Sequence, residues 1–278
     1  MELEQVQSAV GSGDIVFFGV DKELGRRFGG PNTGAATFVR KNTFCMLPWT
    51  QARARACHDI GILNADEPLT AIRNVTALSS RLTQSGLRPV LIGCDHTASM
   101  ANVMGMVQGG RVGMVYLYFD AHFDMGMHRP AQEPPNNGNF VDFLRRAEQI
   151  AKVVNVGGRS WATFAPVYTD LPKFACIPGG VPHVTAAGFI ERLSCLRTAS
   201  LYVSIDADVL DPTFAPNASQ PEPFGMTSDD LFTLCWWLGG NCEVLGADLC
   251  EVVPSDTSCG SEQALVRCLH ALFPKRGH

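Results

Sequence analysis

Three potential metal ligands stand at every second position in the segment VYLYFDAHFDMG, residues 115–126. They are Asp120, His122 and Asp124. In extended backbone, alternate side chains point to the same side, so these three can converge on one point. The residues before them are strong β-formers, which predicts a buried strand that ends where the ligands begin. The pattern therefore indicates a metal site at the end of a strand.

Three further polar motifs follow apolar, β-rich segments. LIGCDH contains Asp95 and His96, SIDADVLDP contains Asp206 and Asp208, and CEVVPSD contains Glu251. One such motif is weak evidence, because a single Asp after a strand is usually a helix cap and a single His is usually a core residue. Four motifs at four strand ends favour one shared site, since ligands bind outside the carboxyl ends of parallel strands.

The charges of these residues favour two cations over one. His96 and His122 would bind metal as neutral imidazoles, whereas the aspartates bring four negative charges. Two divalent ions would balance these charges, and one would leave a large negative excess in a poorly solvated site. Oxygen ligands with some imidazole and no thiolate favour Mn²⁺ over zinc or an iron–sulfur cluster. Two such ions about 3.5–4 Å apart would bridge a water and lower its pKa, creating hydroxide at neutral pH.

The elements that must position these residues alternate between strands and helices. Six segments rich in Val, Ile, Leu and Tyr are predicted as strands: 14–20, 88–93, 112–119, 151–157, 200–206 and 243–252. Their weak alternation is typical of strands covered on both faces. This order predicts an α/β protein with a mostly parallel sheet and helices on both sides.

Three amphipathic helices are predicted between or after the strands. The first spans 68–85 and ends at Gly86, and the last spans roughly 261–273. The middle one begins after Thr227, with Asp230 at the capping-box position and Gly239 beyond its end. We expect Trp236 and Trp237 in this helix to pack in the core and not to form a ligand platform.

Composition is that of an ordinary globular protein. The 278 residues are 46% hydrophobic and 18% charged, and without repeats or linkers they predict a single domain over residues 1–278. The formal charge of −5 gives no reason to expect nucleic acid or an anionic membrane as partner. The N-terminus lacks a basic start and an apolar block, and no window approaches the ~18 apolar residues of a membrane span. We therefore expect a cytoplasmic protein.

Ten cysteines are spread along the chain without CxxC spacing, which argues against a zinc finger or a redox motif. Cys94 and Cys259 each lie near proposed site residues, so they could be close to one another. Two free thiols are the favoured interpretation in a reducing compartment.

As a set, the motifs resemble those of the ureohydrolase family, which includes arginase, agmatinase and formimidoylglutamase. That family shows GGDH, DAHxD and SxDxDxxDPxxAP, and this chain reads GCDH, DAHFD and SIDADVLDPTFAP. RRFGGPNTGAATFVR upstream, and PEPFGMT and EVVPSD downstream, are also similar to family segments. The resemblance spans roughly residues 19 to 256.

This resemblance implies an arginase-like three-layer α/β/α fold that binds two Mn²⁺ per chain. The implied reaction is attack of hydroxide on a guanidino or amidino carbon of a small amino acid, with C–N cleavage, in a chain that could form a homo-oligomer. Glu251 matches the acid that grips the planar guanidinium, a role that suits a bidentate carboxylate. The implied metal ligands are His96, Asp120, His122, Asp124, Asp206 and Asp208.

The substrate loop departs from arginase, which carries SGNxH where this chain has NGNFV. Asn137 and Asn139 resemble the side chains that hold the α-carboxylate of an amino-acid substrate. Val141, however, occupies the position of a histidine that is considered a proton shuttle. Ser160 and Ala162 stand near positions where arginase carries aspartates. Cys94 replaces the second glycine of GGDH.

A missing proton shuttle favours a substrate less basic than guanidinium, because a strongly basic group needs a well-placed proton to expel its amine. Asp124 could pass the proton, with His128 as a weaker candidate. The pattern is most similar to the Nω-hydroxy-L-arginine amidinohydrolase branch, which releases hydroxyurea and L-ornithine and is associated with antibiotic biosynthesis. The alternatives are a formimidoylglutamase, an atypical arginase, a non-catalytic regulator with the same fold, or a single-zinc deacetylase-like hydrolase.

Overall fold

A single sheet of eight parallel strands forms the centre of the protein. The computed structural model describes residues 11–43, 56–126, 133–160, 171–180 and 185–274. The strands are β1 (Ile15–Gly19), β2 (Cys57–Ile62), β3 (Arg88–Ile92), β4 (Met114–Phe119), β5 (Ile150–Val156), β6 (Phe174–Ile177), β7 (Ser200–Asp206) and β8 (Glu243–Cys250). Their order in the sheet is β2-β1-β3-β8-β7-β4-β5-β6, and every pairing is parallel. The predicted parallel sheet is confirmed.

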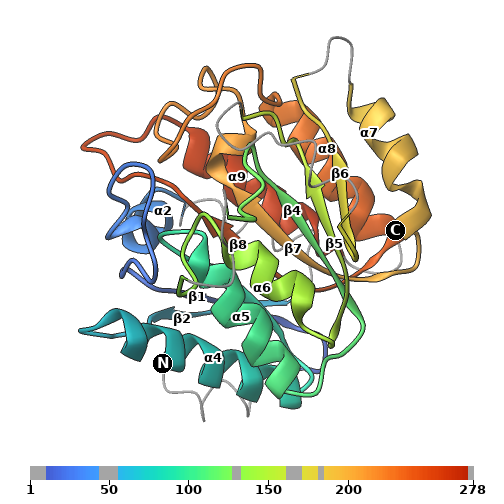
Figure 1. Cartoon of the computed structure of the whole chain (residues 1–278). Coiled ribbons are helices and arrows are strands. Elements are labelled where there is room, and N and C mark those ends of the chain that lie inside the picture. Colours follow the sequence, from blue (N-terminus) through green and yellow to red (C-terminus); the bar gives the residue numbers. More distant parts are fainter. Residues whose placement is uncertain (1–10, 44–55, 127–132, 161–170, 181–184, 275–278) are drawn as a thin grey trace.

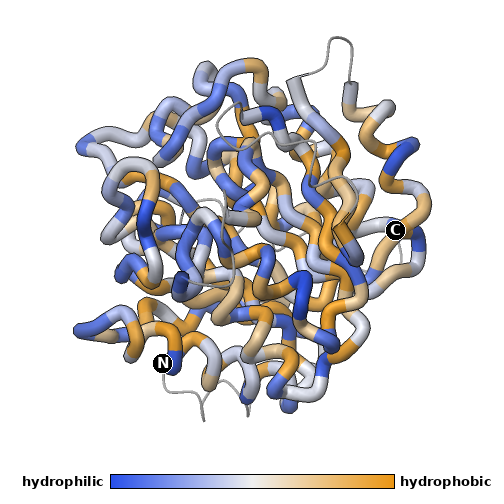
Figure 2. The backbone as a smooth tube through the Cα atoms, in the orientation of Figure 1, coloured by the Kyte–Doolittle hydropathy of each residue, from blue (hydrophilic) through white to orange (hydrophobic). Residues whose placement is uncertain are grey.

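Helices cover both faces of the sheet (Figure 1). One layer contains α4 (Pro68–Gln84), α5 (Thr97–Gln108) and α6 (Phe140–Arg146). The other contains α2 (Ala35–Thr43), α7 (Ala186–Leu193), α8 (Ser228–Asn241) and α9 (Ser261–Ala271). The layer of α2, α7, α8 and α9 packs on one hydrophobic cluster, and the layer of α4, α5 and α6 packs on two others. Figure 2 shows the central strands as largely hydrophobic tubes. The three-layer α/β/α prediction is therefore confirmed.

Strand β4 shows why the sequence lacks a clear alternation. All of its residues are buried. Tyr116 and Tyr118 pack in the cluster beneath α5 and α6, whereas Leu117 and Phe119 pack in the cluster of the opposite layer. Because both faces of a central parallel strand are covered, both sets of side chains are apolar.

The helix ends agree with the predictions at two positions and differ at one. Helix α4 is followed by Gly86, whose φ is +75°. The side chain of Thr227 accepts a hydrogen bond from Asp230 N and caps α8. Gly239 was predicted beyond the end of α8 but lies inside it. A Cβ atom there would lie 2.4 Å from Ala271 O, so this glycine permits close packing of α8 against α9.

Two strands and one tryptophan were not anticipated. Strands β2 and β6 lie at the two edges of the sheet and were not predicted. The prediction that both tryptophans pack in the core is confirmed for Trp237, which is partly buried against the hydrophobic cluster. It is wrong for Trp236, which is 47% exposed. Trp236 instead contacts the Phe232 ring on the outer side of α8, at a centroid distance of 6.1 Å.

The strand order brings distant parts of the chain together. Strands β3 and β4 are consecutive in the sequence, but β8 and β7 lie between them in the sheet. The segments that follow these four central strands therefore emerge side by side at one edge. Among the helices in the described part of the chain, none is long and apolar enough to cross a membrane.

Candidate metal centre

The six predicted ligands come together at the carboxyl ends of β3, β4 and β7. Five of them form two groups, and within each group the ligand atoms lie within 4.8 Å of one another, whereas Asp206 belongs to neither group. The first group contains His96, Asp120 and Asp124, and the second contains Asp120, His122 and Asp208. Asp120 belongs to both groups, so a single carboxylate can bridge two cations.

In the first group, an imidazole nitrogen faces three carboxylates. His96 Nδ1 lies 3.0 Å from Asp120 Oδ2, 3.3 Å from Asp124 Oδ2 and 3.2 Å from Asp206 Oδ2. Both His96 Nδ1 and Asp120 Oδ2 are buried without a hydrogen-bond partner. An unpaired buried polar atom is costly, and a cation between these two atoms would satisfy both. The donor set therefore fits a bound metal.

In the second group, His122 Nδ1 lies 2.9 Å from Asp208 Oδ2 and 3.6 Å from Asp120 Oδ1. In Asp208 and Asp206, the other carboxylate oxygen is held by the backbone. Asp208 Oδ1 accepts a hydrogen bond from Ala121 N at 3.0 Å, and Asp206 Oδ1 accepts one from Asp208 N at 2.9 Å. These bonds leave one oxygen of each carboxylate directed at an imidazole, as a metal site requires.

Excess negative charge raises the pKa of two carboxyl groups in this cluster. Burial raises the pKa of Asp124 to about 7, and the neighbouring charge of Asp120 adds to the effect. Burial also raises the pKa of Asp206 well above its ordinary value, with the charge of Asp208 as the next cause. Cation binding favours the charged carboxylates, so it would lower the pKa of both groups.

The same charge acts in the opposite direction on the imidazole. Burial lowers the pKa of His122, but the charge of Asp208 and hydrogen bonds to Asp120 and Asp208 outweigh burial and raise it to about 12. Burial likewise raises the pKa of Asp120, yet the close imidazoles of His122 and His96 bring it down to about 2. The negative charge of the cluster therefore favours a protonated imidazole, and it would favour a bound cation in the same way.

Glu251 follows β8 and lies against the first group. Its backbone has a φ of +62°, and only 4% of the residue is exposed. Burial, followed by the charge of Asp95, raises its pKa to about 8. Both carboxylate oxygens accept two hydrogen bonds. The donors are His96 N (2.8 Å) and Asn137 Nδ2 (3.2 Å) to Oε1, and Asn32 Nδ2 (2.7 Å) and Ser219 Oγ (2.6 Å) to Oε2.

The two predicted substrate-binding asparagines are placed differently. Asn137 contacts Glu251, and its Oδ1 accepts hydrogen bonds from Arg27 N at 2.9 Å and Phe28 N at 3.2 Å. The Asn139 side chain bonds within its own loop, to Asn136 N at 2.8 Å and Pro134 O at 3.2 Å. The structure therefore brings Asn137 to the site and directs the Asn139 side chain into the loop.

Val141, at the position of the family's histidine, is fully buried in the hydrophobic cluster beneath α6. Its backbone N donates to Asp124 O at 3.1 Å, so the segment adjoins the site while its side chain packs in the core. His128 and Ala162 lie outside the described residues.

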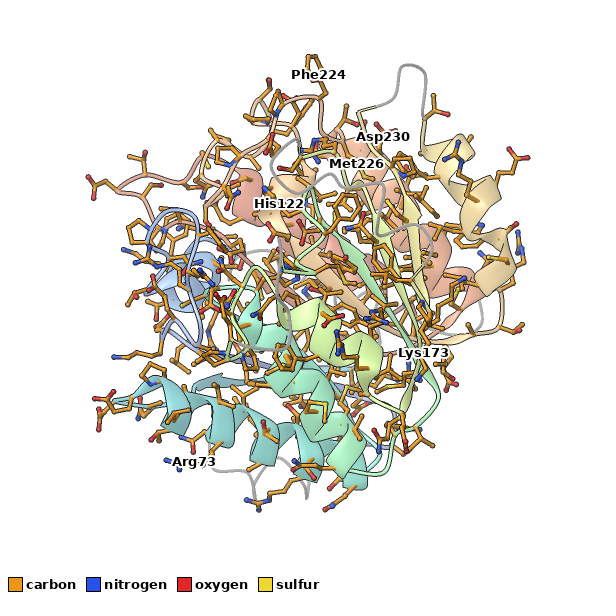
Figure 3. All side chains as sticks on the ribbon, in the orientation of Figure 1. Arg73, His122, Lys173, Phe224, Met226 and Asp230 are labelled. Carbon is orange, nitrogen blue, oxygen red and sulfur yellow. The ribbon has the colours of Figure 1, made fainter. Side chains whose placement is uncertain are left out.

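A loop of residues 219–226 contributes contacts that the sequence did not reveal. His122 Nε2 lies 2.9 Å from Gln220 Nε2 and 3.6 Å from Glu222 Oε1, and Ser160 Oγ donates to Glu222 Oε1 at 2.7 Å. Phe224, in the same loop, is 78% exposed with a φ of +62°, and Figure 3 shows it farther out than His122. The clustering of polar residues with proline and glycine in SQPEPFG was the available signal.

One buried and one partly buried charged residue, Asp95 and Arg159, anchor the loops around the cluster. Asp95 is not among the grouped ligands. It accepts hydrogen bonds from Leu24 N, from Gly25 N at 3.2 Å and from Thr97 N at 3.0 Å. Arg159 donates to backbone carbonyls, which include Asp208 O at 2.7 Å and Glu222 O at 2.8 Å. Arg159 therefore ties the ligand segment after β7 to the 219–226 loop.

Cys94 and Cys259 are both free thiols. Cys94 is buried, its Sγ donates to Val20 O at 3.3 Å, and burial raises its pKa to about 12. Cys259 is exposed and contacts Ser261 Oγ at 3.0 Å. The interpretation as two free thiols is confirmed.

Comparisons with known proteins match this geometry. The model of the arginase family matches residues 14–271. A formimidoylglutamase of Geobacillus thermodenitrificans is 27% identical over 98% of this chain and 85% of its own length. An agmatinase of Chromobacterium violaceum is 27% identical over 91% of this chain and 78% of its own length. The crystal structure of a hypothetical agmatinase from Burkholderia thailandensis aligns with a TM-score of 0.80 and 24% identity, covering 94% of this chain and 84% of that chain.

Proposed function

Because the chain belongs to the arginase family and is a hydrolase of C–N bonds in linear amidines, we propose that it is a binuclear manganese enzyme acting on a guanidino or amidino amino acid. The observation that carries this proposal is the pair of carboxylate–imidazole groups that share Asp120. Oxygen ligands with one imidazole in each group favour Mn²⁺. The residues that would hold the two ions are His96, Asp120, His122, Asp124, Asp206 and Asp208.

Two bound Mn²⁺ ions would supply a hydroxide nucleophile at neutral pH, because together they lower the pKa of a water. Asp124 is the residue we assign to proton transfer toward the departing nitrogen. Asp124 is 8% exposed, more than any of the other five ligands, and its backbone is left-handed, with a φ of +49°. A group that passes protons to a substrate must reach the open side of the site.

Glu251 is the residue we assign to orienting the planar amidinium or guanidinium. Its two oxygens each accept one amide N–H, from Asn137 on Oε1 and from Asn32 on Oε2. A guanidinium offers the same pair of parallel N–H donors, so it would replace these amides with a bidentate, charge-assisted pair. Asn137, once displaced, would be free to bind the substrate's carboxylate. A substrate contact by Asn139 stays a prediction.

Two substrates meet the requirement for a weakly basic reacting group. Nω-hydroxy-L-arginine is the first candidate, with hydroxyurea and L-ornithine as products, because Val141 is apolar and buried where a proton carrier would otherwise stand. N-formimino-L-glutamate is the second, because the relative from Geobacillus thermodenitrificans is a formimidoylglutamase. A non-catalytic regulator is disfavoured, because four buried aspartates destabilise the folded state when no cation compensates their charge.

The test is a substrate panel combined with metal analysis. Purified chain loaded with Mn²⁺ would be assayed at neutral pH with L-arginine, Nω-hydroxy-L-arginine, agmatine and N-formimino-L-glutamate. We expect two ions per chain and the highest kcat/KM for Nω-hydroxy-L-arginine. A preference for agmatine or N-formimino-L-glutamate would overturn the first substrate, and a chain with fewer than two ions and no turnover would support the regulator.

A further inference from the structure

A buried row of polar side chains lies beneath the metal centre and extends from the ligand His96 to residues outside the ligand set. It begins at His96 Nε2, which lies 2.8 Å from Ser204 Oγ. Ser204 Oγ donates to Asp248 Oδ1 at 2.6 Å, and the Tyr202 hydroxyl donates to Asp248 Oδ2. All four residues are fully buried. Ser204 and Asp248 are direct partners in the register of β7 and β8, so strand pairing holds their side chains on the same face.

Each hydrogen in this row has a fixed direction. A carboxylate only accepts, so the single hydroxyl hydrogen of Ser204 is directed to Asp248. Ser204 must therefore accept from His96, which requires a hydrogen on Nε2. The far side is equally constrained. The Tyr202 hydroxyl accepts from Asn102 Nδ2 at 2.7 Å, and Asn102 Oδ1 accepts from Ser79 Oγ at 2.6 Å. Reversal of the Ser204 bond would remove a donor from the buried Asp248 carboxylate.

This direction determines which nitrogen of His96 can bind a cation. A neutral imidazole carries one N–H and one lone pair, so a hydrogen on Nε2 leaves the lone pair on Nδ1. His96 Nδ1 is the atom that faces Asp120, Asp124 and Asp206 and has no hydrogen-bond partner. We propose that Ser204 and Asp248 are positioning residues that hold His96 as its Nε2–H tautomer and present Nδ1 to the metal. This inference rests on the proposed metal centre.

Two substitutions separate this role from simple support of the core. Asp248→Asn keeps the shape of the side chain but can direct an amide N–H at Ser204. The serine hydrogen is then free to turn toward His96 Nε2, which favours the tautomer with Nδ1 protonated and blocked. Ser204→Ala removes the acceptor altogether, and Ser204→Thr retains it. Ser200→Ala is the matched control, because Ser200 lies on the same strand β7 but its Oγ donates to Glu243 Oε2 at 3.2 Å, away from the row.

The experiment measures Mn²⁺ binding by titration calorimetry, together with the number of ions per chain and the melting temperature of each metal-free variant. We expect Ser204→Ala and Asp248→Asn to weaken one of two Mn²⁺ sites by roughly 10- to 100-fold and to leave the other near its original affinity. Ser204→Thr should retain binding, and Ser200→Ala should not change it. If Ser204→Ala does not fold, the isosteric Asp248→Asn still provides the test.

The outcomes are distinguishable. Two wild-type Mn²⁺ affinities in both Ser204→Ala and Asp248→Asn, with two ions in the unchanged chain, would overturn this inference alone. A fall in metal-free melting temperature with equal weakening of both sites would also overturn it, because that is the signature of general core support. Absence of Mn²⁺ binding by the unchanged chain would overturn the proposed metal centre together with this inference.

Discussion

Below the metal centre, His96 Nε2 contacts Ser204, which is paired with Asp248 across two central strands. Above it, His122 Nε2 contacts Gln220 and Glu222, which belong to a loop. We refer to Ser204, Asp248 and Tyr202 as the floor, and to residues 133–139 and 219–226 as the rim. The floor is fully buried and fixed by strand register, whereas the rim is partly exposed and held by turns and by Arg159.

Both histidines have Nδ1 close to carboxylates and Nε2 close to a polar group outside the ligand set. Only the outer groups differ. Strand pairing fixes the floor, whereas the rim can change without loss of the strands that support it. We therefore expect metal binding to depend on the floor and the choice of substrate to depend on the rim.

The largest effect is expected at the ligand that both metal groups share. Asp120→Asn removes the bridging charge, so both ions should be lost and kcat should fall by at least about 1,000-fold. Elemental analysis and the hydrolysis rate measure this. Asp59→Asn on the edge strand β2 is the control, and it should keep two ions. Retention of both ions in Asp120→Asn would contradict the assignment of Asp120 as a ligand that the two ions share.

Glu251→Gln tests the residue between the floor and the rim. The amide retains the shape of the side chain but cannot form a charge-assisted pair, so kcat/KM should fall roughly 10- to 100-fold. The metal content should stay the same, because Glu251 is not a ligand. Glu243→Gln, at the other end of β8, serves as control. Loss of metal from Glu251→Gln would mean that the carboxylate acts on the cluster and not on the substrate.

The stability of the metal-free chain should fall as pH rises from 5 to 8. Folding raises the pKa of Asp124 from 3.8 to about 7, and that of Glu251 from 4.5 to about 8. Each protonated carboxyl favours the folded state below its unfolded pKa, and this advantage is lost as pH rises through the folded pKa. The His122 contribution has the same sign above pH 6.5, because its folded pKa is about 12.

Thermal melts with and without Mn²⁺ measure this dependence. We expect the metal-free melting temperature to fall on the order of 5 °C from pH 5 to 8, and the gain from Mn²⁺ to grow over the same range. Asp124→Asn should show a weaker dependence. A metal-free melting temperature that rises with pH would contradict the charge excess described for the cluster.

Asn137→Ala and Asn139→Ala compare two amides of the rim. Asn137 connects Glu251 to the backbone of Arg27 and Phe28, so its loss should raise KM about fivefold with metal content unchanged. Asn139 bonds within its loop, so Asn139→Ala should act mainly on the melting temperature. Steady-state kinetics of the two variants decide this, and equal effects on KM would assign both side chains to the substrate.

The smallest effect is expected at Phe224→Gly. A phenylalanine with a φ of +62° is strained, and at 78% exposure it buries little surface. Glycine removes the strain but increases the entropy of the unfolded chain, so the free energy of unfolding should rise by only about 0–1 kcal/mol. Denaturant unfolding measures this. A loss of activity in a variant that is no less stable would show that the Phe224 side chain contributes to activity.

The sequence was sufficient to predict the centre of the sheet but not its edges. The six predicted strands carry runs of apolar residues because both of their faces are covered. Edge strand β2, CHDIGI, is only half-buried and mixes polar residues with glycine, and β6 has four residues. Gly239 was read as a helix stop, but its reason lies in the packing of α8 on α9, a tertiary contact with no local signature.

The ligands were predictable because their spacing within each motif reflects the chemistry they share. The floor was not, since His96 and Ser204 are 108 residues apart and each is a single polar residue. One signal was present. Asp248 lies inside the otherwise apolar strand EVLGADLC, and a buried carboxylate there requires hydrogen-bond donors. The partners of Asn137 could not be predicted either, because Arg27 and Phe28 contact it through backbone N–H groups that every sequence has.

The order of the central strands constrains how the protein can be made. As the chain leaves the ribosome, β3 and β4 emerge before β7 and β8, the two strands that separate them in the sheet and the last of its strands to be synthesised. The nascent chain must therefore leave β3 and β4 apart until β8 and β7 arrive to pair with them, a non-local assembly that is slow by nature. The set of six predicted ligands is complete only after translation has passed Asp208, just beyond the end of β7.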